Sequence, residues 1–112
     1  MKGLQITVPV GTDDGTITNV FVKILWASVY TSQQGGTMQR IDLRVRTYAN
    51  EASYDTDPSN TVMIRFLPPV TPIPGFIVTD INNRANVESF IYGRLKNRIE
   101  NKTGAGTVID IP

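Results

Sequence analysis

Hydrophobic and polar residues alternate most clearly in residues 17–48, which we predict to form a long central hairpin on which the rest of the chain is built. In the returning strand, residues 38–48, the odd positions 41–47 hold Ile, Leu, Val and Thr, whereas the even positions 40–46 hold three arginines and one aspartate. This period of two is typical of a strand with one buried face. The outgoing strand, residues 17–30, is largely apolar at both parities, so neither of its faces is expected to lie simply against water.

The hairpin turn is predicted at Gly35-Gly36, because glycine supplies the positive φ values that a two-residue turn requires. Counting outward from this turn sets Trp26 opposite Val45 on one apolar face. Trp26→Ala is then expected to lower the free energy of unfolding by roughly 3–5 kcal/mol. The predicted core combines this face with a helix further along the chain: Ile24, Trp26, Leu43, Val45, Val87, Ile91, Leu95 and Ile99.

The period changes to that of a helix over residues 82–102, where Val87, Ile91, Leu95 and Ile99 recur every four residues and form one apolar stripe. Gly104 stands just past the expected end, where glycine commonly stops a helix. Gly93 falls on the polar back of the helix, where it costs about 1 kcal/mol relative to alanine. The candidate caps at the start are Asp80, Asn82 and Asn83.

The remaining segments complete an α+β fold that is mainly β, either an antiparallel sheet or a sandwich, in a single domain of residues 1–112. Alternating residues predict strands at 4–10, 61–67 and 107–111, with Pro9 marking the end or an edge of the first one. Residues 50–60 read as a polar loop. Four prolines in residues 68–75 predict a stiff connector that lies outside the sheet.

The composition excludes several kinds of catalytic and metal site but identifies no particular activity. With 112 residues, 40% hydrophobic and 19% charged, the chain is long enough for one folded core, and its net charge of +1 gives no global attraction to nucleic acid or membranes. Because cysteine and histidine are absent, Ser-His-Asp and Cys-His nucleophile systems and Cys/His zinc sites are excluded. No signal peptide or membrane-spanning segment is evident, so we expect a soluble protein of the cytoplasm that is not exported by the classical route.

Two acidic segments resemble ligand sites only superficially. The segment from Asp55 to Asn60 begins like a calcium-binding loop, but Asn60 stands where that loop has glycine and Phe66 where it has glutamate. Asp13-Asp14-Gly15 is ordinary turn chemistry. We therefore expect no metal, no cofactor and no catalytic residue.

The apolar residues at the odd positions of residues 17–30, on the second face of the predicted strand, leave two interpretations open. These residues are either covered within the chain, as in a sandwich, or they form a subunit interface, since large apolar surfaces left outside mark association. The arginines of the returning strand and of the helix would border the same interface or would face phosphates. The candidate interface residues are Phe21, Leu25, Val29, Arg44, Arg46, Phe90, Arg94 and Arg98.

By its type rather than by a motif, the chain resembles small structural proteins of bacteriophage virions, such as head-tail connectors, tail or baseplate subunits and capsid-decorating proteins. The features that carry this resemblance are the β-rich VFVKILWASVY segment, uncharged polar loops such as TSQQGGT, the proline-rich PPVTPIPG segment, and the absence of cysteine and histidine. The resemblance implies homo-oligomers that contact other virion proteins and, if the protein is viral, a location in the virion; it implies no site residues.

Three functional hypotheses follow. The preferred one is a non-enzymatic structural subunit that pairs with its neighbours through exposed strand edges. The second is a nucleic-acid-binding module that uses the strand and helix arginines. The third is a small hydrolase or sugar-binding domain, which requires carboxylates from separate loops to converge in one cleft. Its candidates are Asp13, Asp14, Asp55 and Asp57.

Overall fold

The computed structural model describes residues 1–30, 38–77 and 87–112. The predicted turn at Gly35-Gly36 and the candidate helix caps Asp80, Asn82 and Asn83 lie outside these residues, as do the side chains of Val29 and Val87. Within the described residues the fold is α+β and mainly antiparallel β, as the sequence predicts. The elements are β1 (Gly3–Ile6), β2 (Val10–Thr12), β3 (Gly15–Ile17), β4 (Val20–Tyr30), β5 (Met38–Tyr48), α1 (Glu51–Thr56), β6 (Val70–Ile77), α3 (Val87–Thr103) and β7 (Val108–Ile111).

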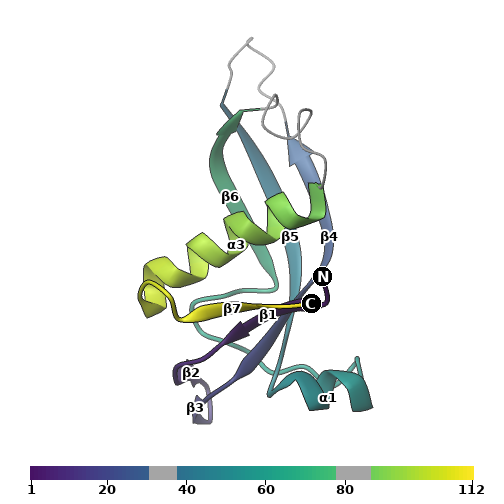
Figure 1. Cartoon of the computed structure of the whole chain (residues 1–112), viewed down its shortest axis with the longest axis vertical. Coiled ribbons are helices and arrows are strands. Elements are labelled where there is room, and N and C mark those ends of the chain that lie inside the picture. Colours follow the sequence, from purple (N-terminus) through teal and green to yellow (C-terminus); the bar gives the residue numbers. More distant parts are fainter. Residues whose placement is uncertain (31–37, 78–86) are drawn as a thin grey trace.

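Five of the strands form one antiparallel sheet in the order β6-β5-β4-β1-β7, and β2 and β3 form a separate two-stranded sheet (Figure 1). The two long strands β4 and β5 are consecutive and pair with each other, as the central hairpin requires. The two ends of the chain lie together, because β1 near the N-terminus pairs with β7 at the C-terminus.

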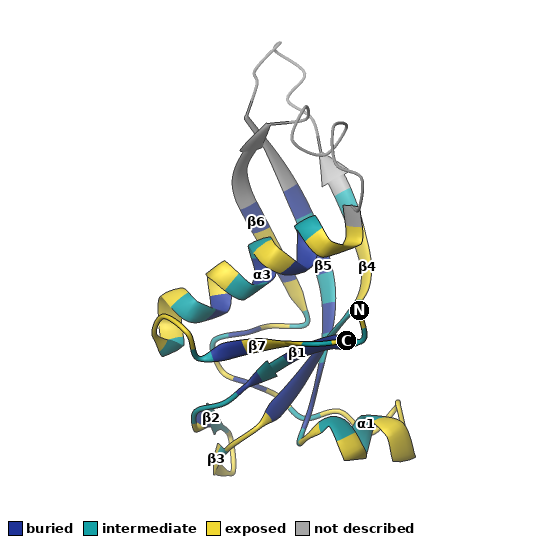
Figure 2. Cartoon of the chain, viewed as in Figure 1, coloured by how far each residue is buried: buried dark blue, intermediate teal, exposed yellow. Residues whose placement is uncertain are grey.

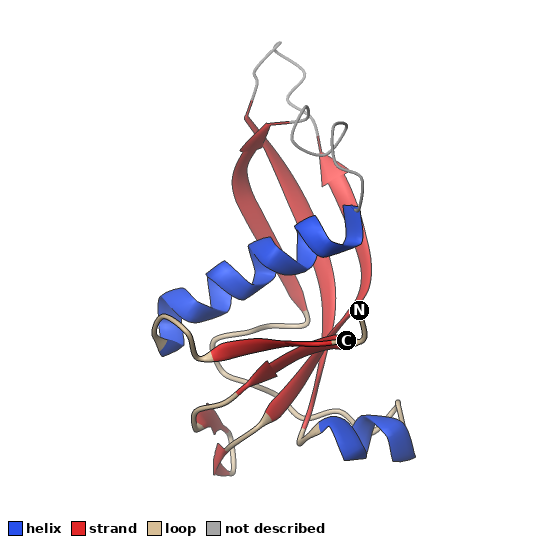
Figure 3. Ribbon diagram, in the orientation of Figure 1, coloured by secondary structure: helices blue, strands red, loops and turns tan. Residues whose placement is uncertain are grey.

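Helix α3 crosses one face of the five-stranded sheet, and the shorter α1 lies apart from it beside the lower ends of β4 and β5 (Figure 3). The main core lies between α3 and the sheet, where Leu43 of β5 and Leu95 of α3 are both fully buried. Figure 2 shows that burial is concentrated where α3 covers the strands and decreases along the outer surface of the helix. The predicted core is confirmed for Leu43, Val45, Ile91, Leu95 and Ile99.

The pairing register of β4 and β5 differs from the predicted one, and the difference removes Trp26 from the core. Trp26 lies opposite Arg44 rather than Val45, because the register shifts between Ile24 and Trp26 and leaves Leu25 as an extra residue. Such a β-bulge moves every following side chain to the opposite face. Trp26 is 46% exposed, so its predicted place in the core was wrong, whereas Ile24 is partly buried against the core.

The proline-rich segment joins the sheet, contrary to the prediction of a connector. Residues 70–77 form β6, which pairs with β5, although the segment contains Pro72 and Pro74. Because β6 is the outermost strand in the sheet order, a proline can turn its missing donor toward the outside without breaking a ladder hydrogen bond.

Two other segments also differ from their predictions. Residues 61–67 form no regular strand: Ile64 and Leu67 make a single bridge around a turn, and both side chains enter the core. The polar loop contains α1, which begins after Asn50, whose side chain accepts a hydrogen bond of 2.8 Å from the Ser53 backbone N–H. The N-terminal strand ends at Ile6, before Pro9, and Val10 begins β2.

The end of α3 agrees with the sequence. The helix ends at Thr103, Gly104 follows with a φ of 106°, and the Gly104 N–H donates to the Glu100 carbonyl oxygen at 2.8 Å. This backbone conformation explains the glycine, because residues with a Cβ rarely adopt it.

We expect Gly93→Ala to raise the free energy of unfolding by about 0.5–1 kcal/mol. Gly93 lies on the exposed side of α3, and an added Cβ would meet nothing within 4 Å. Alanine would therefore restrict the unfolded chain without any steric cost in the folded one. Urea denaturation followed by circular dichroism measures the change, and a loss of stability would contradict an open helix surface here.

Candidate functional site

The upper half of β4 is the least covered part of the sheet. Strand β1 pairs only with residues 20–22 of β4, so among the described residues no strand continues the sheet on that side of β4 beyond Val22. The first three side chains beyond this point are exposed: Leu25 retains 49% of its accessible surface and Trp26 46%, and Ala27 is exposed as well. We call residues 25–30 the open section of β4.

The open section has apolar side chains on both faces of the sheet. On the α3 side, Leu25 and Ala27 line a hollow of about 480 Å³ whose floor includes Ile24, Ile91 and Tyr92. On the opposite side, Trp26 lies across from Arg44, whose side chain faces away from α3. A segment added at this edge would therefore find apolar partners above and below the sheet.

Tyr92 closes the lower end of the open section. Its hydroxyl oxygen accepts a hydrogen bond of 2.9 Å from the Ile24 backbone N–H, and the side chain is almost fully buried. Burial raises the pKa of Tyr92 above its ordinary value, so the hydroxyl is neutral at physiological pH. The Ile24 N–H thus faces away from β5 and has a partner within the chain.

Below the open section, the second face of β4 is covered within the chain. Phe21 is fully buried, with its ring centroid 5.1 Å from that of Tyr54 in α1 and 6.2 Å from that of Tyr48. The Nζ of Lys2 binds both Glu51 and Asp55 of α1, at 2.8 and 2.7 Å, and holds the helix against β1. Hydrogen bonds to these carboxylates, chiefly that of Asp55, raise the pKa of Lys2.

The predicted interface residues therefore divide into different environments. Phe21 is inaccessible to another chain, because α1 covers it, whereas Leu25 is exposed. Phe90 is partly buried against the core, and Arg94 and Arg98 lie beside it on α3. We did not predict α1 from the sequence and therefore did not expect Phe21 to be covered within the chain. Asn50 followed by the acidic Glu51 is a pattern that favours the start of a helix and could have indicated α1.

The arginines of β5 and α3 do not form one basic surface. Arg44 and Arg46 alternate with Leu43 and Val45, whose side chains face α3, so they lie on the other face of the sheet. Arg46 donates a hydrogen bond to the Pro58 carbonyl oxygen at 3.3 Å, and both arginines line a hollow that contains Met63. Arg94 and Arg98 line a different hollow with Ile73.

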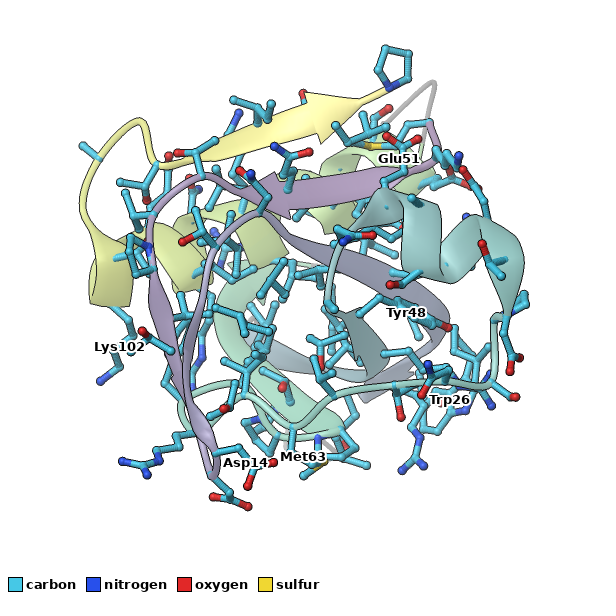
Figure 4. The ribbon with its side chains drawn as sticks, turned by 90° about the horizontal axis from the view of Figure 1, so that it is seen from below. Asp14, Trp26, Tyr48, Glu51, Met63 and Lys102 are labelled. Carbon is cyan, nitrogen blue, oxygen red and sulfur yellow. The ribbon has the colours of Figure 1, made fainter. Side chains whose placement is uncertain are left out.

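The acidic residues do not converge in a cleft. Asp13 and Asp14 are exposed at the tip of the β2–β3 hairpin, whereas Asp55 and Asp57 lie in and after α1, on the other side of the molecule (Figures 1 and 4). Hydrogen bonds from the Ser59 hydroxyl and backbone N–H lower the pKa of Asp57, which suits a turn rather than a general acid. In the described part of the chain no three acidic residues come together as metal ligands would.

Comparison of the chain with protein-family models, curated proteins and solved structures gave no match. Neither of the helices that the structure describes has the length and apolar character needed to cross a membrane. The interpretation of the site therefore depends on its geometry alone.

Proposed function

We propose that this protein is a non-enzymatic structural subunit that assembles with copies of itself and with other proteins. The observation that carries this proposal is the open section of β4, where Leu25, Trp26 and Ala27 lie exposed beside one another on a strand in the middle of the sheet order. Scattered apolar residues on a surface are ordinary, but a contiguous group marks an association site when it adjoins a strand edge with which no described strand pairs.

Tryptophan and arginine are the residues that most often dominate the energy of protein interfaces. Trp26 is the one tryptophan of the chain, and it lies opposite Arg44 in the β4–β5 pairing. Tryptophan contributes a large rigid contact area, and the guanidinium group stacks on aromatic surfaces and binds carboxylates. These properties favour a protein partner over a small-molecule substrate.

We further propose that the assembly is a bacteriophage virion, on the resemblance of the chain to small connector, tail, baseplate and capsid-decorating proteins. In such an assembly, other structural proteins would contact the surfaces that copies of this chain leave free. The division of the arginines between the two faces of the sheet weakens the alternative of nucleic-acid binding, because it leaves no continuous basic groove for a phosphate backbone.

We expect the purified protein to self-associate, and the double substitution Leu25→Ser with Trp26→Ser to abolish this. In sedimentation equilibrium the mass of the unsubstituted chain should rise above 12.4 kDa with concentration, whereas the substituted chain should stay at 12.4 kDa. The physical reason is the loss of apolar area at the joint, worth about 25 cal/mol per Å².

A matched control removes the same kind of surface elsewhere. Ile109 of β7 is 43% exposed and lies two strands away from β4 in the sheet order, so Ile109→Ser should leave self-association unchanged. A chain that remains monomeric at every concentration and binds no other protein would contradict the proposed function. An equal loss of self-association in the Ile109→Ser variant would contradict the proposed location.

A further inference from the structure

We infer that the open section of β4 joins to the open section of a second copy, strand against strand in antiparallel orientation about a two-fold axis. This inference rests on the proposed function and specifies its joint: a continuous sheet that runs from one molecule into the next. Four features carry it, namely the direction of the backbone groups, the condition of the other sheet edges, the absence of charge in the section, and its size.

The direction of the backbone groups follows from Pro72. Proline has no N–H, and Pro72 of β6 lies opposite Asp42 of β5, so this pair does not exchange hydrogen bonds and Asp42 turns its N–H and C=O toward β4 instead. Asp42 lies opposite Ser28, which makes Asp42 and Ser28 a hydrogen-bonded pair. Since these pairs alternate along antiparallel strands, the neighbouring Ala27 directs its N–H and C=O away from β5, toward the open edge.

The Ile24–Val45 pair gives independent support for this alternation. The Ile24 N–H donates to the Tyr92 hydroxyl, and the Val45 N–H donates to the Pro69 carbonyl oxygen at 2.8 Å, so neither points at the other strand. Ile24 thus already has a partner on the open side. Beyond Ile24, the outward N–H and C=O groups of β4 have no hydrogen-bond partner among the described strands.

The other edges of the five-stranded sheet are less suited to pairing. The outer edge of β6 contains Pro72 and Pro74, and prolines on an edge prevent a further strand from adding. The outer edge of β7 has only four residues, and Asp110 within it forms an ion pair with Lys96 at 3.7 Å. The open section has six residues, no proline and no charge, so it lacks the usual protection against strand addition.

A second copy fits this edge because residues 25–30 carry no charged side chain. Antiparallel pairing of the section with itself therefore sets no like charges opposite each other, whatever its centre. Six residues extend over about 20 Å, which gives an interface below the roughly 1,600 Å² of a standard protein complex. We accordingly expect a weak dimer whose population depends on concentration, as suits a joint that is repeated in a larger assembly.

Ala27→Pro tests the strand pairing directly. The substitution removes the outward N–H and leaves the N–H groups of the β4–β5 ladder in place, so the monomer should fold while dimerisation weakens roughly tenfold to a hundredfold. The matched control is Ala27→Thr, which keeps the N–H and should retain the dimer. If the proline variant fails to fold by circular dichroism, Ala27→Lys replaces it: Ala27 is exposed in the monomer, so lysine is tolerated there, but the dimer would bring two ammonium groups together and should be lost.

Two readouts separate this joint from any other mode of association. The fluorescence of Trp26 comes from the one tryptophan in the chain, so its emission should move to shorter wavelength as concentration rises. The Ala27 amide hydrogen, followed by NMR, should exchange more slowly in the dimer than in the monomer, as a new ladder hydrogen bond requires.

The outcomes are distinct. Slower Ala27 exchange together with loss of dimer in Ala27→Pro supports the inference. A dimer that forms with unchanged Ala27 exchange, or that survives the proline, overturns the strand joint but leaves the structural subunit standing. A chain that is monomeric alone but binds a different protein at this edge overturns the second copy as the occupant. A monomer that binds nothing overturns both proposals.

Discussion

Phe21→Ala should lower the free energy of unfolding by about 3–5 kcal/mol, the cost of removing a large aromatic side chain from a closed site. Phe21 is fully buried between β4 and α1, and its ring packs against those of Tyr48 and Tyr54. The substitution also removes one of two aromatic contacts of Tyr54 in α1; the other, with Tyr48 at a ring-centroid distance of 5.0 Å, remains. Guanidinium chloride denaturation followed by circular dichroism gives the value by linear extrapolation.

Trp26→Ala is the control for this prediction, because it removes a still larger aromatic side chain from the same strand. Trp26 is 46% exposed, so its loss should cost the monomer no more than about 2 kcal/mol, less than the 3–5 kcal/mol that the sequence suggests. Both variants should be measured at a concentration low enough to keep the chain monomeric. A larger loss for Trp26 than for Phe21 would show that the β4 register is the one predicted from the sequence.

Leu95→Ala should lower the free energy of unfolding by about 2–5 kcal/mol, a large share of the 5–15 kcal/mol typical of a domain. Leu95 is fully buried in the middle of α3, within the cluster that joins this helix to β5 and β1. The cavity left by the substitution cannot close easily, because Ile91 and Ile99 fix the helix on either side. Thermal melting followed by circular dichroism measures the loss.

Leu25→Ala makes the same chemical change at a site that is 49% exposed, and it should cost about 1 kcal/mol or less. Equal losses at the two positions would contradict the arrangement in which α3 covers the core and leaves the open section of β4 uncovered. The two leucine variants together test whether α3 buries Leu95 while Leu25 stays exposed, and the proposed function depends on that exposure.

The sequence predicts elements whose signal is long and regular. The long central strands, the helix stripe through Leu95 and the glycine stop at Gly104 all appear in the structure, because each depends on a repeated pattern or on the conformational freedom of one residue. The short element α1 has six residues and no apolar stripe, so periodicity could not reveal it.

The errors come from features that no local pattern records. The bulge at Leu25 reverses the parity of the following residues, and both registers place apolar residues opposite one another, so alternation alone could not choose between them. The prolines of β6 exclude an interior strand, and from this the sequence suggests a connector. They do not exclude a strand at the outer edge of the sheet, which is where β6 lies. The open section results from the bulge at Leu25, which exposes Trp26, and from the short β1, which pairs only with residues 20–22 of β4.

The pairing of β1 with β7 determines when the sheet can be completed. Gly3 lies opposite Ile111, so this part of the sheet joins residues from the two extremes of the sequence. Contacts between neighbouring strands such as β4 and β5 can form while synthesis is still under way, but β7 can pair with β1 only after residues 108–111 have left the ribosome. During synthesis we therefore expect the β7 side of β1 to stay unpaired until then, and the β1–β7 pairing to form late in folding.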